Sequence, residues 1–187
     1  MNELLLLEKE LLAPSDALVN DLRKIDGDIM LLGAGGKMGP SMAVLAKQAM
    51  EKAGLSHKVI AVSRFSDEAM RTQLEAAGVQ TISADLLNDA ELQALPFAPN
   101  VIYLAGHKFG TTGKEAFTWA MNAYLPGRVA EKYKQSRIVA FSTGNVLPFV
   151  PVHSGGLSEE ATPAPLAEDE GAKGTVRQTG TATVQAK

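Results

Sequence analysis

The fold is decided by residues 29–53, which read IMLLGAGGKMGPSMAVLAKQAMEKA. Four apolar residues, a glycine-rich turn, and a run in which apolar residues recur every three or four positions predict a strand, a tight turn and a helix, in that order. At Gly33 the missing side chain permits the turn, and at Gly39 it lets the helix pack closely on the strand. Gly36, together with Gly35, lets a pyrophosphate approach the backbone without a Cβ in the way.

The start of this helix is a candidate phosphate site. Free backbone N–H groups and the positive end of the helix dipole favour an anion there. Pro40 suits a first helical turn, because its missing N–H has no partner to lose. The loop is not that of nucleoside triphosphatases, because Lys37 is followed by Met38 and not by Ser or Thr. The motif predicts a nucleotide site that includes Lys37 and Met38; a purely structural turn is the alternative.

The rest of the chain continues the alternation of strands and helices. Short runs rich in Val, Ile and Leu predict five strands, over residues 28–32, 58–62, 79–82, 100–104 and 137–141. Apolar residues at three- and four-residue spacing predict helices over residues 40–53, 67–77, 88–94 and 114–134. The near-continuous apolarity of the strands predicts burial on both faces, and Pro126 is expected to bend or break the last helix.

Successive βαβ units of this kind predict an α/β fold. We expect a Rossmann-type, doubly wound parallel sheet in a three-layer αβα arrangement, with its ligand crevice at the carboxyl ends of the strands. Residues 1–27 form a helical lead with an amphipathic helix over 4–12, and residues 28–166 form the nucleotide-binding domain. Residues 167–187 are expected to be a flexible tail, because they carry too little apolar surface to offset the entropy lost on ordering.

Composition excludes several classes of function. The chain has 18 Lys and Arg against 21 Asp and Glu, and it lacks the dense basic cluster that nucleic-acid binding needs. It has no cysteine, which excludes disulfides and thiolate metal sites, and its three histidines are too scattered in sequence to indicate a metal. No apolar run approaches the roughly 20 residues of a membrane span. Charged residues flank the short run at 4–7, so we expect a cytoplasmic protein without an export signal or a membrane partner.

The spacing Gly33-x-x-Gly36-x-x-Gly39 resembles that of the extended short-chain dehydrogenases/reductases, the family of NAD-dependent epimerases and dehydratases. Asn122 also falls where this family commonly has an Asn. Three later segments, each after a predicted strand, agree with the family: Ala84-Asp85-Leu86, Leu104-Ala105-Gly106 and Phe141-Ser142-Thr143-Gly144-Asn145-Val146. The resemblance covers about residues 28–165 and implies that these segments adjoin the cofactor, with Asp85 at the adenine.

The end of the second predicted strand bears on the choice of cofactor. In dinucleotide sites an acidic residue at this place accepts a hydrogen bond from the adenosine ribose 2′-OH. Here the sequence is Val62-Ser63-Arg64, so no carboxylate repels a 2′-phosphate and a guanidinium is available to bind it. We therefore expect NADP in preference to NAD at Ser63 and Arg64; the alternative is that Arg64 is merely solvated.

The resemblance implies hydride transfer to or from nicotinamide, with a Ser or Thr hydroxyl orienting the substrate and a Tyr, assisted by a Lys, as general acid/base. Thr143 matches the hydroxyl position and is the candidate catalytic residue; the alternative is that it caps the strand end. The Tyr-x-x-x-Lys motif expected later is absent, because all three tyrosines precede Thr143 and the later lysines are Lys173 and Lys187. His107 is either a solvated loop residue or a neighbour of nicotinamide or substrate.

Two functions remain open. The first is an NAD(P)-binding, epimerase- or dehydratase-like oxidoreductase, incomplete at its C-terminus and with little or no activity as this chain. Its substrate would be a small molecule, such as a nucleotide sugar or another hydroxy or keto compound. The alternative is a non-catalytic NADP-binding sensor or interaction module. The helix predicted over 114–134 has apolar side chains on more than one face, and the resemblance implies a homodimer interface there.

Overall fold

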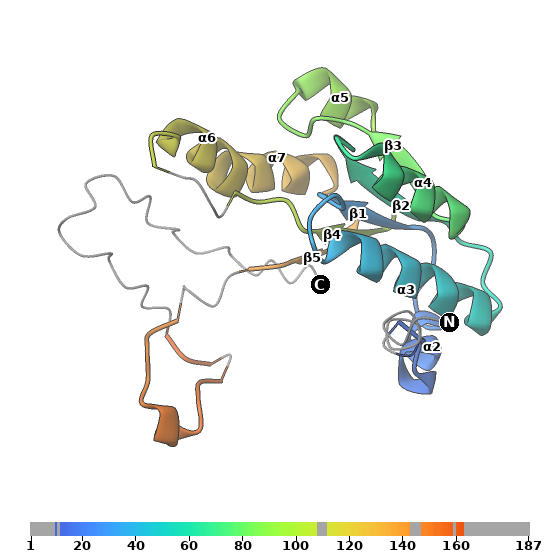
Figure 1. Ribbon diagram of the computed structural model, residues 1–187, viewed down its shortest axis with the longest axis horizontal. Helices are drawn as coiled ribbons and strands as arrows, with labels where there is room; N and C mark the ends of the chain where they lie inside the picture. Colours follow the sequence, from blue (N-terminus) through green and yellow to red (C-terminus); the bar gives the residue numbers. More distant parts are fainter. Residues whose placement is uncertain (1–9, 11, 108–111, 143–146, 159, 163–187) are drawn as a thin grey trace.

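The structure, a computed structural model, describes residues 10, 12–107, 112–142, 147–158 and 160–162. A single sheet of five parallel strands, in the order β3-β2-β1-β4-β5, forms the middle layer (Figure 1). The strands are β1 (Ile29–Leu32), β2 (Val59–Ser63), β3 (Gln80–Ser83), β4 (Asn100–Tyr103) and β5 (Arg137–Ala140). This confirms the predicted doubly wound α/β fold. The winding direction reverses between β1 and β4, which places the expected crevice at the carboxyl ends of these strands.

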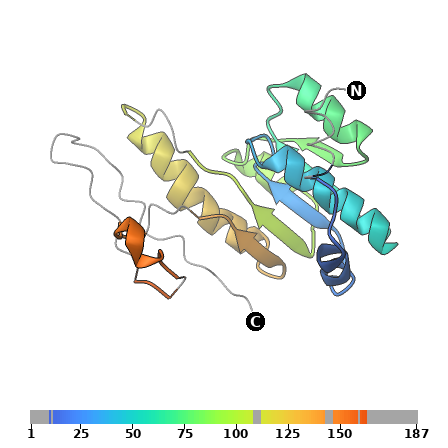
Figure 2. The same ribbon diagram turned by 60° about the horizontal axis from the view of Figure 1, so that its bottom comes forward.

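Helices cover both faces of this sheet (Figures 1 and 2). They are α2 (Asp16–Leu22), α3 (Gly39–Ala53), α4 (Glu68–Ala76), α5 (Asp89–Ala94), α6 (Glu115–Trp119), the π-helix η1 (Ala120–Tyr124), α7 (Leu125–Lys132) and the 3₁₀-helix η3 (Val152–Ser154). One apolar cluster contains the buried residues of α2, α3 and α4, and a second contains those of α5 and α7. Among the described residues, no helix has both the length and the apolar character to cross a membrane.

Strand β1 contributes side chains to both apolar clusters, because successive side chains of a strand point to opposite faces of the sheet. Met30 and Leu32 belong to the cluster with α5 and α7, whereas Ile29 and Leu31 belong to the cluster with α2, α3 and α4. All four residues are buried, and β2 and β4 beside them are mostly buried as well. Each fully buried side chain of this size stabilises the fold by about 1.5–3 kcal/mol. The predicted burial on both faces is therefore confirmed for the three central strands.

For β3 and β5 the predicted burial on both faces is wrong. The ends of β3 are exposed, and β5 has one partly buried residue, Ile138, and three exposed ones. Val139 is 60% exposed. Each of these strands pairs with one neighbour, β3 with β2 and β5 with β4, so both lie at edges of the described sheet. Apolar periodicity does not distinguish a central strand from an edge strand, because both need at least one buried face.

The helix predicted over 114–134 consists of three segments, α6, η1 and α7. The π-helical turn ends directly before α7, and Pro126 lies in the first turn of α7. Proline has no N–H to donate to the preceding turn, so the change of hydrogen bonding here agrees with the predicted break. Met121, Leu125 and Val129 lie four residues apart and pack in the same apolar cluster. In a regular α-helix, residues four positions apart differ by about 40° in their direction around the helix axis. The wider π turn reduces the total difference between Met121 and Val129.

The predicted division of the chain into a lead, a domain and a tail stays a prediction, because most of both ends lies outside the described residues. The amphipathic helix predicted over 4–12 lies almost entirely outside the described residues, and the tail predicted over 167–187 lies wholly outside them. Between them and the sheet, α2 begins where the Ser15 hydroxyl accepts a hydrogen bond from Leu18 N at 3.2 Å. Val19 and Leu22 of α2 are buried in the cluster with α3.

We predict that Gly39→Ala destabilises the protein by about 3 kcal/mol, because its Cβ would lie 2.1 Å from the Ala34 carbonyl oxygen, where only a backbone shift makes room. Gly127→Ala is the matched control: its Cβ meets nothing within 4 Å, and in α7 the change should stabilise by up to about 1 kcal/mol. Urea unfolding of both variants measures the difference. Equal midpoints for Gly39→Ala and the parent chain would contradict the close packing of α3 on the end of β1.

Candidate functional site

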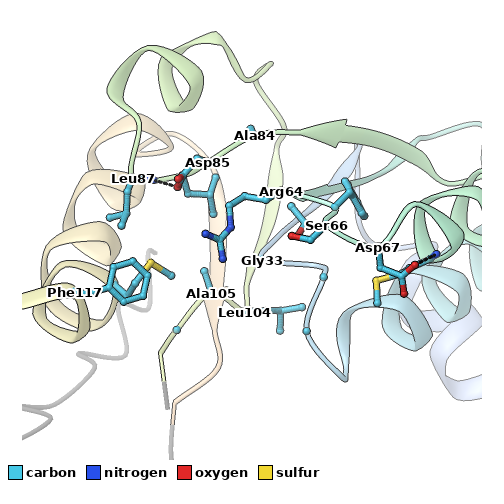
Figure 3. Close-up of a pocket in the computed structure, with 18 residues that line it drawn as sticks. Gly33, Arg64, Ser66, Asp67, Ala84, Asp85, Leu87, Leu104, Ala105 and Phe117 are labelled. Atoms are coloured by element: carbon cyan, nitrogen blue, oxygen red, sulfur yellow. Dashed lines mark hydrogen bonds between the residues drawn. The ribbon is translucent and has the colours of Figure 1, made fainter. Parts of the chain in front are cut away.

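A cleft of about 350 Å³ opens at the carboxyl ends of β1, β2, β3 and β4, as the winding of the sheet predicts (Figure 3). Ten of the residues that the sequence assigns to the cofactor line it: Gly33, Gly35, Gly36, Ser63, Arg64, Asp85, Leu86, Leu104, Ala105 and Gly106. Segments far apart in sequence therefore meet at one place.

The glycines of the first turn serve different purposes. Gly33 has φ +87°, and a Cβ there would lie 2.6 Å from Ala105 N, so this turn requires glycine. A Cβ on Gly35 would lie 2.3 Å from the Ser63 hydroxyl oxygen. At Gly36 the nearest atom to such a Cβ is the Gly33 carbonyl oxygen, at 3.8 Å. Gly36 thus leaves open space beside the backbone, as the approach of a ligand requires.

The N-terminus of α3 adjoins this open space. Among the described residues, none caps the helix through its side chain, and its first turn contains no acidic residue. In contrast, Asp67 caps α4 and Asn88 caps α5, each by accepting two backbone hydrogen bonds. The positive end of the α3 dipole is therefore left for an anion, whereas the other two helix starts are satisfied by the protein's own side chains.

Arg64 follows β2 directly and enters the cleft. In the view of Figure 3 its side chain extends between Asp85 and Ala105. Its carbonyl accepts a hydrogen bond from the Ser83 hydroxyl at 3.2 Å, which fixes the backbone to β3. The next residue, Phe65, is buried and has φ +45°, a conformation that side chains other than glycine adopt rarely. This turn brings the following residues, which were not predicted, to the cleft.

The loop between β3 and α5 forms another wall. Asp85 Oδ1 accepts a hydrogen bond from Leu87 N at 3.0 Å, and Asp85 N donates one to the Glu91 carboxylate at 2.7 Å. Asn88 N donates to the Asp85 carbonyl at 2.9 Å. The loop that contains the predicted adenine residue is thus shaped by its own polar groups.

Asn122 does not line the cleft, although the sequence assigns it to the cofactor. Its side chain accepts a hydrogen bond from His107 N at 2.7 Å and donates one to the His107 carbonyl at 2.8 Å. Both bonds fix the chain directly after Gly106, which does line the cleft. Asn122 therefore acts on the site through the backbone, because its amide holds the turn that follows β4.

His107 is half-buried in the loop after β4 and does not line the cleft. Its Nδ1 lies 2.9 Å from the Thr118 hydroxyl oxygen. The Thr118 hydroxyl also lies within hydrogen-bond distance, 3.1 Å, of the Lys114 carbonyl. The imidazole also contacts the Phe117 ring edge-on, at 5.0 Å between centroids.

The other predicted residues that the structure describes do not line the cleft. Lys37, Met38 and Ser142 are described but do not line it, and Gly39 is buried against Ala34. Thr143, the candidate catalytic residue, lies outside the described residues. Ala84, which the sequence placed in the same segment as Asp85, also lines the cleft. The other lining residues were not predicted from the sequence: Phe65, Ser66, Asp67, Met70, Leu87, Phe117 and Met121. Most of these residues are neighbours in sequence of predicted ones. Their position next to a strand end could therefore have indicated that they line the cleft.

None of the three tyrosines, all of which are described, lines the cleft. The Tyr103 hydroxyl donates to the Met121 carbonyl at 3.3 Å, and burial raises the pKa of Tyr103 well above its usual range. Burial likewise raises the pKa of Tyr133 to about 12. Tyr124 is 59% exposed and does not line the cleft. A catalytic tyrosine needs a lowered pKa, which is the opposite of what burial does here.

Solved structures with a similar fold include the following three. They are a short-chain dehydrogenase/reductase superfamily protein from Agrobacterium tumefaciens with bound NAD (TM-score 0.53, 19% identity), UDP-glucuronic acid 4-epimerase from Bacillus cereus in complex with NAD (0.53, 22%) and ADP-L-glycero-D-manno-heptose-6-epimerase from Helicobacter pylori (0.54, 16%). The matches cover 74%, 75% and 80% of this chain. The sequence matches no protein-family profile and no curated protein.

The chain spans less than half the length of each of these structures: 39%, 46% and 47%. The described part of this chain has the fold of short-chain dehydrogenase/reductase and epimerase structures, as the glycine spacing and the three later segments predicted.

Proposed function

We propose that this chain binds a nicotinamide dinucleotide in the cleft, with the pyrophosphate on the turn between Gly33 and Gly39. The observation that carries the proposal is the open space at Gly36 beside the start of α3, which none of the described side chains caps. Main-chain N–H groups and the helix dipole favour an anion there. The fold shared with two structures that contain NAD supports the same assignment.

NADP is the proposed preferred cofactor. Among the lining residues the charged ones are Arg64, Asp67 and Asp85. Both carboxylates already accept hydrogen bonds from backbone N–H groups, Asp67 from α4 and Asp85 from Leu87. A guanidinium binds phosphate through paired, charge-assisted hydrogen bonds. Arg64 therefore supports a 2′-phosphate at the end of β2.

The proposed reaction class is that of extended short-chain dehydrogenases/reductases acting on a small hydroxy or keto compound, nucleotide sugars included. When bound, the nicotinamide would supply or accept a hydride. Thr143 is the proposed hydroxyl that orients the substrate oxygen. The general acid/base is the missing part, because burial raises the pKa of both Tyr103 and Tyr133. The chain by itself is therefore proposed to bind cofactor and to turn over little or no substrate.

A non-catalytic NADP-binding sensor or interaction module is the second candidate. The same tyrosines favour it, and so does apolar surface on the helix layer: Trp119 is 45% and Tyr124 59% exposed. Both belong to the helix predicted over 114–134, for which we propose contact with a second copy of the chain in either case.

Titration of the purified chain with NADPH and with NADH, followed by nicotinamide fluorescence and by thermal stability, tests the binding proposal. Gly36→Ala is expected to weaken both affinities by about tenfold or more, because its methyl group occupies the pyrophosphate position. Its melting temperature without ligand should stay close to that of the parent chain, because its Cβ has no close neighbour. Binding of neither nucleotide to the parent chain, or unaltered binding to Gly36→Ala, would refute the assignment.

Arg64→Ala tests the cofactor preference. The variant is expected to lose about ten- to a hundredfold in affinity for NADPH, which corresponds to one charge-assisted hydrogen-bond pair of roughly 1.5–3 kcal/mol, and to bind NADH almost as before. Arg64→Lys, which keeps the charge but not the planar fork, should fall between the two. Equal losses for both nucleotides would show that Arg64 does not contact the 2′-phosphate.

The proposed lack of turnover is tested with a panel of nucleotide sugars and simple hydroxy and keto compounds. We expect no change of nicotinamide absorbance above the uncatalysed background, because the described residues supply no tyrosine of lowered pKa near the cleft. A rate on the order of 1–1000 s⁻¹, as ordinary enzymes show, would instead eliminate the sensor as an alternative.

A further inference from the structure

Arg128 connects the helix layer to one wall of the cleft. It lies on α7, and only 13% of its side chain is exposed. Its Nη1 donates to the Leu87 carbonyl at 3.5 Å, and its Nη2 forms an ion pair with the Asp89 carboxylate. The guanidinium also lies over the Tyr124 ring, 5.4 Å from its centroid. A charge so far removed from water is costly unless it is paired, so these contacts define where the side chain rests.

The loop that Arg128 contacts is part of the cleft. Asp85, Leu86 and Leu87 all line it. The beginning of the loop is tied to the sheet, because Ala84 N donates to the Ser63 carbonyl at 2.9 Å. The bonds described above between Asp85, Leu87 and α5 join the loop to itself and to the next helix. The hydrogen bond from Arg128 joins the far end of the loop, at Leu87, to helix α7.

The helical segment that contains Arg128 also contributes to the cleft wall, beside this loop. Phe117 of α6 and Met121 of η1 line the cleft, and α7 continues directly from η1. Figure 3 shows Leu87 and Phe117 on the same side of the cleft, across from Ser66 and Asp67. Arg128 therefore bridges the loop and the helical segment that carries Phe117 and Met121.

We infer that Arg128 is a positioning residue for dinucleotide binding: its bridge from α7 to Leu87 and Asp89 holds the loop after β3 in the conformation that lines the cleft. The inference rests on the proposed function, since it supposes that a dinucleotide occupies the cleft. Arg128 itself does not line the cleft, so it acts through the loop and not by contact.

Lys132 provides a matched control on the same helix. Its ammonium donates to the Gln93 carbonyl of α5 at 2.9 Å, so it too joins α7 to the segment after β3. Gln93 does not line the cleft. If the bridge merely fastens α5 to α7, then the loss of either cation has the same effect. If the bridge positions the loop, then only Arg128 affects ligand binding.

The experiment compares Arg128→Met with Lys132→Met in the full chain, by titration with NADPH and by amide hydrogen exchange without ligand. We expect Arg128→Met to weaken NADPH binding by about tenfold and to speed exchange at Leu87 and Asn88. Lys132→Met should bind NADPH like the parent chain and leave that exchange unchanged. Arg128→Lys should lie between, because one ammonium cannot hold both Leu87 and Asp89 as the fork does. If Arg128→Met folds poorly, the comparison of Arg128→Lys with the parent chain provides the test instead.

Two negative results are distinguishable. A parent chain that binds no NADPH overturns the proposed function and this inference with it. A parent chain that binds NADPH, with equal affinities for Arg128→Met and Lys132→Met or with unchanged exchange at Leu87, overturns the inference alone.

Discussion

Two backbone segments lie close together at the start of α3, where a side chain on Gly39 would collide with the Ala34 carbonyl. Any side chain at this position would push the helix away from the end of β1. Because none is present, the first turn of α3 sits at the carboxyl edge of the sheet, next to the open space at Gly36. The polarity of the helix is thereby directed at the cleft, and the other three strand ends supply the walls.

The fold was predictable because short apolar runs and helical spacing are local signals, and right-handed crossovers then leave few topologies. The position of a strand within the sheet, central or at an edge, has no such local signal in the sequence. Val139 lies in a run as apolar as that of β1, yet it is exposed, because exposure depends on which elements pack against β5. The π turn before Pro126 was foreseen as a break, but its width depends on how Met121 and Leu125 pack in the core.

The site was predictable to the extent that parallel strands bring their ends together. Ser63, Asp85 and Ala105 are far apart in sequence and adjoin in the structure for this reason. Residues that act at a distance were harder to predict. Asn122 occupies a position where the family commonly has an Asn, but its amide binds the backbone of His107 and does not line the cleft. Phe117 reaches the cleft because of the path of its helix, which no short motif encodes.

The π-helical turn has a consequence for how insertions and deletions act on this molecule. The residues after it, Leu125 and Val129, are fixed in the core, whereas Phe117 before it faces the cleft. A π turn accommodates about one residue more than an α turn, so a deletion within 120–124 that converts it into an ordinary turn leaves the flanking segments at nearly the same angle around the axis. The core side chains after the turn and Phe117 before it would then keep their faces. The π turn is therefore a place where the helix tolerates the loss of one residue without changing the orientation of the ligand site relative to the core.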